Sequence, residues 1–270
     1  MLTFMKSNRT SILYITLSLL GCAYSSAQTG SDKTKVVPDP LQKTETKTSE
    51  AALLEQLKKV DETTYQIGRI TIDTLKRSIS FDATFEITDT LIEYAIVNPE
   101  GKIHEALFIT DVRPIHLNIA FKLLGFKENK SLFRKFVNDL PTAEYNTATP
   151  EQKAHSYFNI SVSWTDAKSK NMHSHNINEL IRNAQNESTL AQAKTNEIWS
   201  YGGSFMHKGK FAAELNKDLI AIFTDRGAVA NYAGKGREDD TLWHPVTEKL
   251  PLYGTKATIT ITPQFPSLKK

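Results

Sequence analysis

The stretch IEYAIVNPEGKIHEALFI, residues 92–109, decides the predicted fold. Two apolar segments, residues 92–97 and 102–109, flank the tetrapeptide Asn98-Pro99-Glu100-Gly101. Pro at the second position and Gly at the fourth are typical of a type I turn followed by a glycine bulge. We therefore expect an antiparallel β-hairpin here.

The pattern on either side of this stretch adds further strands and some helices. Pro114 suits the first turn of a helix, and residues 114–126 are dense in Ile, Leu and Phe. Strands are expected at residues 67–73, 78–87, 158–164, 172–177, 198–205, 211–215, 219–223 and 257–262, and further helical segments at 51–60, 132–137 and 177–193. Residues 225–251 are expected to be a loop. This mixture predicts one α+β domain, rich in strands, built mainly of antiparallel hairpins with two or three helices.

The N-terminal residues 1–27 have the three parts of an export signal. Lys6 and Arg9 precede an apolar run of ten residues, which is too short to span a bilayer as a helix. Two cleavage sites are open: residues 19–22 resemble a lipobox that would lipidate Cys22, and a small-residue site ends at residue 27. Both predict export. We favour the lipoprotein because Cys22 is the only cysteine and stands where a lipobox requires it.

The next segment, residues 28–50, is rich in Lys, Thr, Ser and Pro and carries few large apolar residues. Such a composition cannot bury enough surface to offset ordering entropy, so it predicts a disordered tether. The globular domain is expected at residues 51–266.

Charge and cysteine content exclude several classes of function. Of the 33 basic residues, Lys6 and Arg9 lie in the leader, which leaves 31 against 30 acidic residues. A domain so balanced lacks the clustered basic residues that nucleic-acid binding requires. Beyond Cys22 the chain has no cysteine, so it has no thiolate nucleophile and no cysteine-held metal or iron–sulfur cluster. The sequence predicts no cofactor.

Several stretches resemble the YdjY-type domain family, a group of exported bacterial proteins of unknown activity. The resemblance rests on residues 92–94, 98–102 and 104–107, Asp111, Pro114, residues 123–125 and 199–204, Trp243 and residues 251–255. It covers nearly the whole domain. It implies an envelope location and no established reaction.

Glu105 and His116 are the leading candidates for a catalytic role. Successive strand residues face opposite sides of a sheet, so Glu105 shares its side with Ile103 and Leu107. His116 lies on the apolar stripe of its helix and in the first turn, where the helix dipole disfavours a positive imidazole. We expect a neutral, inward-facing His116 that forms a hydrogen bond with Glu105. A structural polar pair and a ligand-facing site are both open, and the structural pair is favoured.

The register of the expected hairpin decides which other side chains face a ligand. With a bulge at Gly101, Glu105 lies diagonal to Glu93 and the two form a carboxylate pair; without it, Glu105 faces Tyr94. The turn sequence favours the bulge. Glu93, Tyr94 and His104 are therefore the ligand-facing candidates.

His173 and His175 would share one face of a strand, a spacing that can serve a metal ion. A third ligand is missing from the sequence pattern, so no metal site is predicted and the pair stays a weak candidate.

Two functions from different classes remain open. The first, which we favour, is a non-catalytic envelope module that binds an envelope protein or a cell-wall component and meets the membrane only through a lipid at Cys22. The second is a hydrolase-like or metal-dependent enzyme that uses Glu105 with His116, or the His173/His175 pair.

Overall fold

The computed structural model describes residues 55–193 and 198–266. The expected signal peptide, Cys22 and the expected tether lie outside the described residues. No helix in the described part of the chain is long and apolar enough to cross a membrane.

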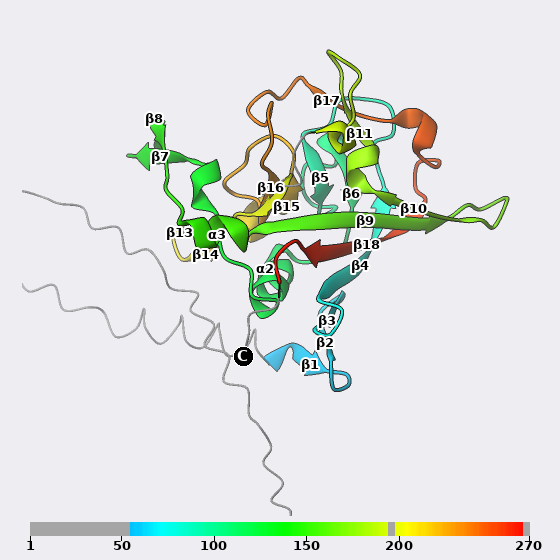
Figure 1. The fold of residues 1–270 in the computed structure, drawn as a ribbon, viewed down its shortest axis with the longest axis horizontal. Coiled ribbons are helices and arrows are strands. Elements are labelled where there is room, and N and C mark those ends of the chain that lie inside the picture. Colours follow the sequence, from blue (N-terminus) through cyan, green and yellow to red (C-terminus); the bar gives the residue numbers. More distant parts are fainter. Residues whose placement is uncertain (1–54, 194–197, 267–270) are drawn as a thin grey trace, which may run out of the picture. The chain divides into compact units, whose positions relative to one another are not determined.

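Eight strands form a closed barrel (Figure 1). In order around the ring they are β4 (Ser78–Phe85), β18 (Lys256–Pro263), β9 (Tyr157–Thr165), β12 (Trp199–Tyr201), β16 (Ala230–Tyr232), β15 (Asp218–Ala221), β5 (Tyr94–Val97) and β6 (Ala106–Ile109). The pairing of β6 with β4, where Phe108 lies opposite Phe85, closes the ring. Closure leaves these eight strands without a free edge.

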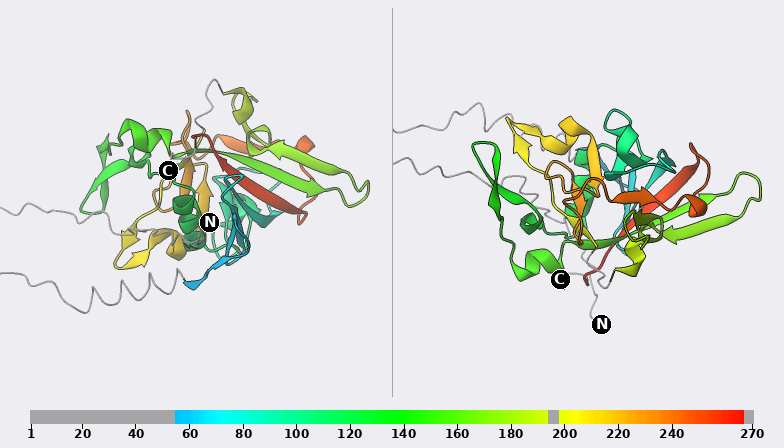
Figure 2. Two further views of the ribbon diagram at one scale, coloured as in Figure 1. Left: turned by 60° about the horizontal axis from the view of Figure 1, so that its bottom comes forward. Right: turned by 90° about the horizontal axis from the view of Figure 1, so that it is seen from above.

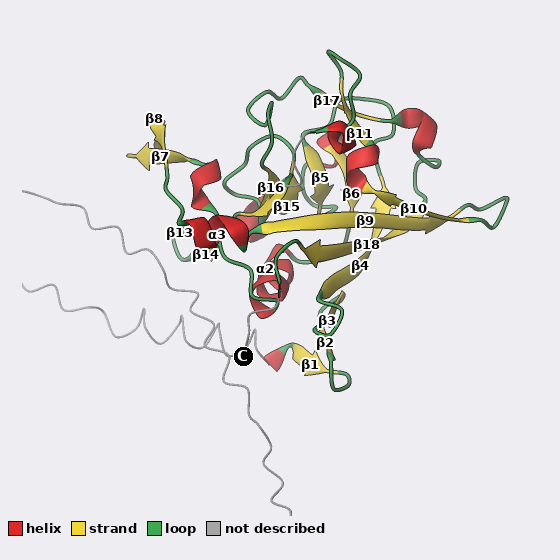
Figure 3. Ribbon diagram, viewed as in Figure 1, coloured by secondary structure: helices red, strands yellow, loops and turns green. Residues whose placement is uncertain are grey.

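The predicted α+β fold is therefore wrong, because the domain is mostly β. Its three described α-helices are α2 (Pro114–Leu123), α3 (Pro150–Ala154) and α4 (Ala212–Asn216), and all are short. Figure 3 shows mainly strands and loops with few helical turns. Closure depends on pairings between distant segments, which a local pattern of apolar residues does not encode.

The three long barrel strands follow a strict alternation of buried and exposed residues. In β4, β9 and β18 every second side chain is buried, as in the aligned trio Phe81, Val162 and Ile259. Burying a side chain of this size stabilises the fold by roughly 1.5–3 kcal/mol. The expected strands in these three regions are confirmed.

The four short strands β12, β16, β15 and β5 are buried at every position. Burial on both faces requires a cover on each side. Helix α2 contacts β15, β3 (Ile70–Asp73) and α4, and contributes to this cover. The helix predicted from Pro114 is confirmed and ends at Leu123.

The hairpin predicted at residues 92–109 is wrong, because β5 and β6 pair in parallel. The turn itself forms, with the amide of Gly101 donating to the carbonyl of Asn98 at 2.8 Å. The following 3₁₀ turn η1 (Ile103–Glu105) then carries the chain back, so that Ala106 lies beside Tyr94. The antiparallel neighbour of β5 is β15. The turn residues specified a reversal, but not the pairing that follows.

Other expectations are also corrected. The helix expected at residues 177–193 is replaced by η3 (Ile177–Glu179), β11 (Ile181–Asn183) and η4 (Leu190–Gln192). The strand expected at 211–215 is mostly α4, the helical turn expected at 132–137 is mostly β7 (Arg134–Val137), and the expected 225–251 loop contains β16 and β17 (Trp243–Pro245). The described part of the helix expected at 51–60 contains β1 (Leu57–Lys59).

The remaining elements extend or decorate the barrel. They are β2 (Thr64–Ile67), β8 (Leu140–Tyr145), β10 (Met172–Asn176), β13 (Met206–His207), β14 (Lys210–Phe211), η2 (Lys130–Leu132) and η5 (Thr247–Lys249). The β7–β8 hairpin and the β9–β10 hairpin extend from opposite sides of the barrel (Figures 1 and 2).

Candidate functional site

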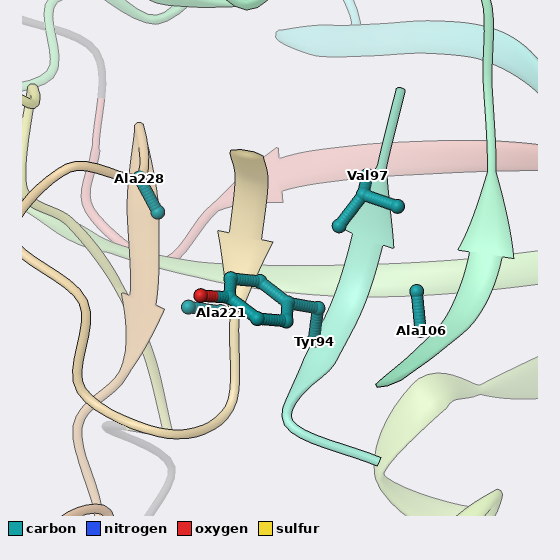
Figure 4. Close-up of a cluster of buried hydrophobic side chains, with 5 residues drawn as sticks. All are labelled: Tyr94, Val97, Ala106, Ala221 and Ala228. Atoms are coloured by element: carbon teal, nitrogen blue, oxygen red, sulfur yellow. The ribbon is translucent and has the colours of Figure 1, made fainter. Parts of the chain in front are cut away.

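Tyr94, the first residue of β5, is the centre of the candidate site. Its side chain is buried, and its ring reaches from β5 toward Ala221 on β15, with Ala228 nearby (Figure 4). The hydroxyl donates to Oδ2 of Asp225 at 3.3 Å and accepts from the ammonium of Lys102. That ammonium also lies 4.6 Å from the ring centroid. Burial raises the pKa of the Tyr94 hydroxyl well above its ordinary value, so the side chain stays neutral.

Asp218 and Asp225 are adjacent carboxylates in this region. Asp218 begins β15 and is fully buried, and its side-chain partner is the carboxyl group of Asp225. Burial first, and then the nearby charge of Asp225, raise the pKa of Asp218 to about 8. At neutral pH Asp218 therefore holds a proton that it can donate to Asp225, as expected for two carboxylates that cannot both ionise cheaply.

The loop between β15 and β16 holds Asp225 in place. Its backbone amide donates to Oδ1 of Asn231 at 2.8 Å, and its own Oδ1 accepts from the amide of Gly227 at 2.6 Å. The short parallel connection from β15 to β16 thus fixes the acid that Tyr94 contacts.

Glu93 and Glu105 add two further carboxylates. The amide of Glu93 donates to the carbonyl of Glu105 at 2.8 Å, and the carbonyl of Glu93 accepts from Ile222 and Phe223. Burial raises the pKa of Glu93, and the charges of Glu105 and Asp240 raise it further. The charge of Glu105 also contributes to the raised pKa of Asp218.

We call this group the acid cluster; its carboxylates surround Tyr94 and Lys102. Its members are Glu93, Tyr94, Lys102, Glu105, Asp218 and Asp225. The cluster contains four carboxyl groups and one ammonium. It can therefore hold protons at neutral pH, or attract a further positive charge.

The sequence favoured Glu93 as the neighbour of Glu105 and kept Tyr94 as the alternative; in the structure Glu93 is bonded to Glu105 through the backbone and Tyr94 pairs with the next residue, Ala106. The route differs, since they meet across two parallel strands rather than across a hairpin. His104 is the exception: it is solvent-exposed, and its Nε2 lies 3.5 Å from Oε1 of Glu105.

The structure does not bring Glu105 and His116 together. Nε2 of His116 shares a hydrogen bond of 2.9 Å with Oε1 of Gln56, and its ring packs against Gly68. The expectation of a buried, neutral imidazole is confirmed, because burial and then the charge of Arg113 lower the pKa of His116. The predicted hydrogen bond between Glu105 and His116 is absent from the described residues.

His173 and His175 share one face of β10, as predicted. Both rings stack on Trp164 of β9 with centroids 5.2 Å apart, and Nδ1 of His175 lies 3.0 Å from Oε2 of Glu179. In the described ranges, no group of three His, Cys, Asp or Glu side chains is arranged to hold a metal ion.

Sequence reasoning missed Lys102, Asp218 and Asp225. Asp218 was detectable, since it stands directly before the apolar run Leu219 to Ile222, where an acid is costly unless paired. Its proximity to Asp225 depends on the β15–β16 connection, and its proximity to Tyr94 depends on the pairing of β15 with β5. No local pattern carries that information.

A hollow of about 310 Å³ lies elsewhere, between residues 183–193 and residues 232–243. Its walls carry amide and hydroxyl side chains together with Tyr232, Leu242 and Trp243. It is formed by segments that were expected to be a helix and a loop.

The described chain is thus a closed eight-stranded barrel with a partly buried acid cluster at one group of neighbouring strands. A family model, the YdjY domain, matches residues 70–262, and the chain belongs to this family. The resemblance found in the sequence is confirmed. No curated protein and no solved structure matches the chain.

Proposed function

We propose that the protein is an exported, lipid-anchored envelope module that binds a cationic group of its partner at the acid cluster and catalyses no reaction. The observation that carries this proposal is the acid cluster, in which four carboxyl groups accompany a single ammonium group, that of Lys102. Carboxyl groups whose pKa is raised by burial and by nearby like charges are concentrated at functional sites.

The N-terminal sequence supports the proposed location. A short apolar leader with two basic residues supports export, and Cys22 at the end of a lipobox supports attachment to a membrane. One acyl-modified cysteine at the end of a tether leaves the barrel free to meet a partner in the envelope.

Burial favours binding over catalysis. Tyr94 is 1% exposed and Asp218 is 0% exposed, so an incoming group meets the partly buried members of the cluster and not these two. The hollow of about 310 Å³ is lined by other residues. Glu93, Glu105 and Asp225 are only partly buried and can meet an incoming charge.

The excess of negative charge defines the chemistry of the partner. Lys102 already places one ammonium against the hydroxyl and ring of Tyr94. The chain itself therefore demonstrates that an ammonium group fits here, where a carboxylate cluster and an aromatic ring both favour a cation. A partner amine would bind next to Lys102, at the partly buried carboxylates Glu93, Glu105 and Asp225.

Calorimetric titration with cadaverine, a simple diamine, tests the proposal at low ionic strength and pH 8.5, where Asp218 is largely ionised. We expect binding that Asp218→Asn weakens at least tenfold and that Lys102→Met strengthens by removing the internal competitor. Asp111→Asn is the matched control, because Asp111 is an exposed acid that pairs with Arg69. Absence of heat with the unaltered protein, or equal affinity in D218N, would overturn the proposal.

A further inference from the structure

Strand β10 lies at an edge of the main sheet. It pairs along its whole length with β9, residue for residue and without a bulge. In the described part of the chain, no strand pairs with its other side, and no backbone hydrogen bond from outside the β9 ladder reaches it. A row of unpaired amides and carbonyls on such an edge is a template for a further strand.

The composition of β10 distinguishes it from the other edge strands. Charged side chains and proline are the usual protection of an exposed edge. Every other edge strand of three or more residues in the described ranges carries such a residue: Lys58 in β1, Arg134 in β7, Pro141 in β8, Arg182 in β11 and Pro245 in β17. β10 reads MHSHN and contains no Lys, Arg, Asp, Glu or Pro. Its edge is therefore open to pairing.

The sequence of β10 is nearly symmetric about Ser174, which suits pairing with a copy of itself. In an antiparallel pair centred on this residue, Ser174 lies opposite Ser174 of the second copy and His173 lies opposite its His175. The rings of His173 and His175 already stack on Trp164 of β9, with interplanar angles of 9° and 21°. Cross-strand ring pairs stabilise a sheet, and a second β10 would extend this row of rings.

The two flanks of β10 carry opposite charges. Lys168 and Lys170 are exposed in the turn before the strand, and Glu179, whose side chain is 41% exposed, follows it in η3. Asp166, the acid of the same turn, accepts from the amides of Lys168 and Ser169. Antiparallel alignment brings the basic flank of one copy toward the acidic flank of the other, at both ends of the strand. Such complementarity favours association in this orientation.

We infer that the protein forms a twofold dimer by antiparallel pairing of β10 with β10 of a second copy, which joins two barrels through one continuous sheet. The β9–β10 hairpin projects from the barrel and presents this edge (Figures 1 and 2). A contact built on five residues is small, and small interfaces are typical of transient association. Dimer formation therefore depends on protein concentration. It uses no residue of the acid cluster and is independent of the proposed function.

Sedimentation equilibrium of the full chain over a hundredfold range of concentration tests the inference, and we expect a reversible monomer–dimer equilibrium. Ser174→Lys places two ammonium groups opposite each other at the twofold axis, where like charges destabilise a strand pair. It should weaken dimerisation at least tenfold. Ser161→Lys is the matched control, because Ser161 is an exposed residue of β9 that already has a strand on each side. A chain that stays monomeric, or a dimer that S174K leaves intact, would overturn the inference.

Hydrogen–deuterium exchange locates the contact. The amides of β10 should exchange more slowly as protein concentration rises, and S174K should remove this dependence. The β7–β8 hairpin, on the other side of the barrel, is the internal reference and should exchange at the same rate throughout. Protection that rises with concentration in β7 and β8 and not in β10 would place the contact elsewhere and contradict the inference. Asp218→Asn should leave dimerisation unchanged, which separates this test from that of the proposed function.

Discussion

The backbone amide of Glu93 donates to the carbonyl of Glu105 at 2.8 Å, so two acidic residues are held side by side where β5 and β6 begin. Two carboxylates at adjacent positions of neighbouring strands repel one another. The consequence is visible in Glu93, whose pKa is raised by burial first and by Glu105 second.

Replacing Glu105 with Gln should lower the pKa of Glu93 and leave it above its ordinary value, because burial remains the larger cause. NMR titration of the Glu93 carboxyl carbon measures the change. Asp240→Asn is the matched control and should produce a smaller drop, since Asp240 is the weaker of the two charge effects. An unchanged Glu93 pKa in E105Q would contradict the carboxylate pair.

Asp218→Asn should change how stability depends on pH. The folded protein holds the Asp218 proton with a pKa of about 8, against an ordinary value of 3.8, so it binds more protons than the unfolded chain between these values. The free energy of unfolding therefore falls as pH rises from about 4 to 8, at up to about 1.4 kcal/mol per pH unit, and the loss is complete above pH 8.

Asn cannot titrate, so D218N should lose this slope. Urea unfolding of both proteins at pH 5, 6.5, 8 and 9 measures the difference, and D218N should be the more stable protein at pH 9. Asp111→Asn should keep the slope of the unaltered protein. Parallel curves for D218N and the unaltered chain would show that Asp218 is not the proton holder.

Local signals in the sequence predicted the local structure. Pro114 at the first turn of α2, and the strict alternation of β4, β9 and β18, act through neighbours close in the chain and need no knowledge of the rest. The same rules predicted that His116 would face the core and stay neutral, and burial followed by the charge of Arg113 lowers its pKa.

Long-range pairing could not be predicted in this way. The sequence from Asn98 to Gly101 forms its turn, yet the partner of β5 across the barrel is β15, more than a hundred residues away. A continuous apolar segment such as β5 can pair with parallel or with antiparallel neighbours inside a sheet, because both of its faces are buried. The acid cluster depends on these pairings. The proximity of Glu93 and Glu105 was therefore predicted from a hairpin that does not form, and Asp218 was missed.

His116→Gln should make the protein less sensitive to acid. Burial lowers the pKa of His116 in the folded protein below the ordinary value of 6.5. Below pH 6.5 the unfolded chain therefore binds a proton at this residue more readily than the folded protein does. Stability from this group is complete above pH 6.5 and is lost as pH falls through the folded-state pKa.

Gln keeps a polar group opposite Gln56 without a charge to bury. Comparison of urea midpoints between pH 7 and pH 5 should show a smaller fall in H116Q than in the unaltered protein. His104→Gln, at an exposed position, should show the full fall. An equal fall in H116Q and H104Q would exclude His116 as the acid-sensitive group.

Arg226 holds the β7–β8 hairpin to the body of the domain. Its guanidinium carbon lies 3.6 Å from the ring centroid of Phe136 on β7 and 4.3 Å from that of Phe205, so the planar group stacks between two rings. Lysine has no planar face and cannot stack on both. Arg226→Lys should therefore lower the free energy of opening of the hairpin by about 1–2 kcal/mol. Its amides should then exchange roughly fivefold to thirtyfold faster.

Hydrogen–deuterium exchange of β7 and β8, with β9 as an internal reference, measures this effect in the intact protein. The control is Lys135→Met, which removes an exposed ion pair of 2.6 Å between Lys135 and Glu144 within the same hairpin. Exposed ion pairs contribute little to stability, about 0–1 kcal/mol. The hairpin amides of K135M should therefore exchange nearly as slowly as those of the unaltered protein. If K135M speeds amide exchange in the β7–β8 hairpin more than R226K does, the guanidinium of Arg226 is not what holds this hairpin in place.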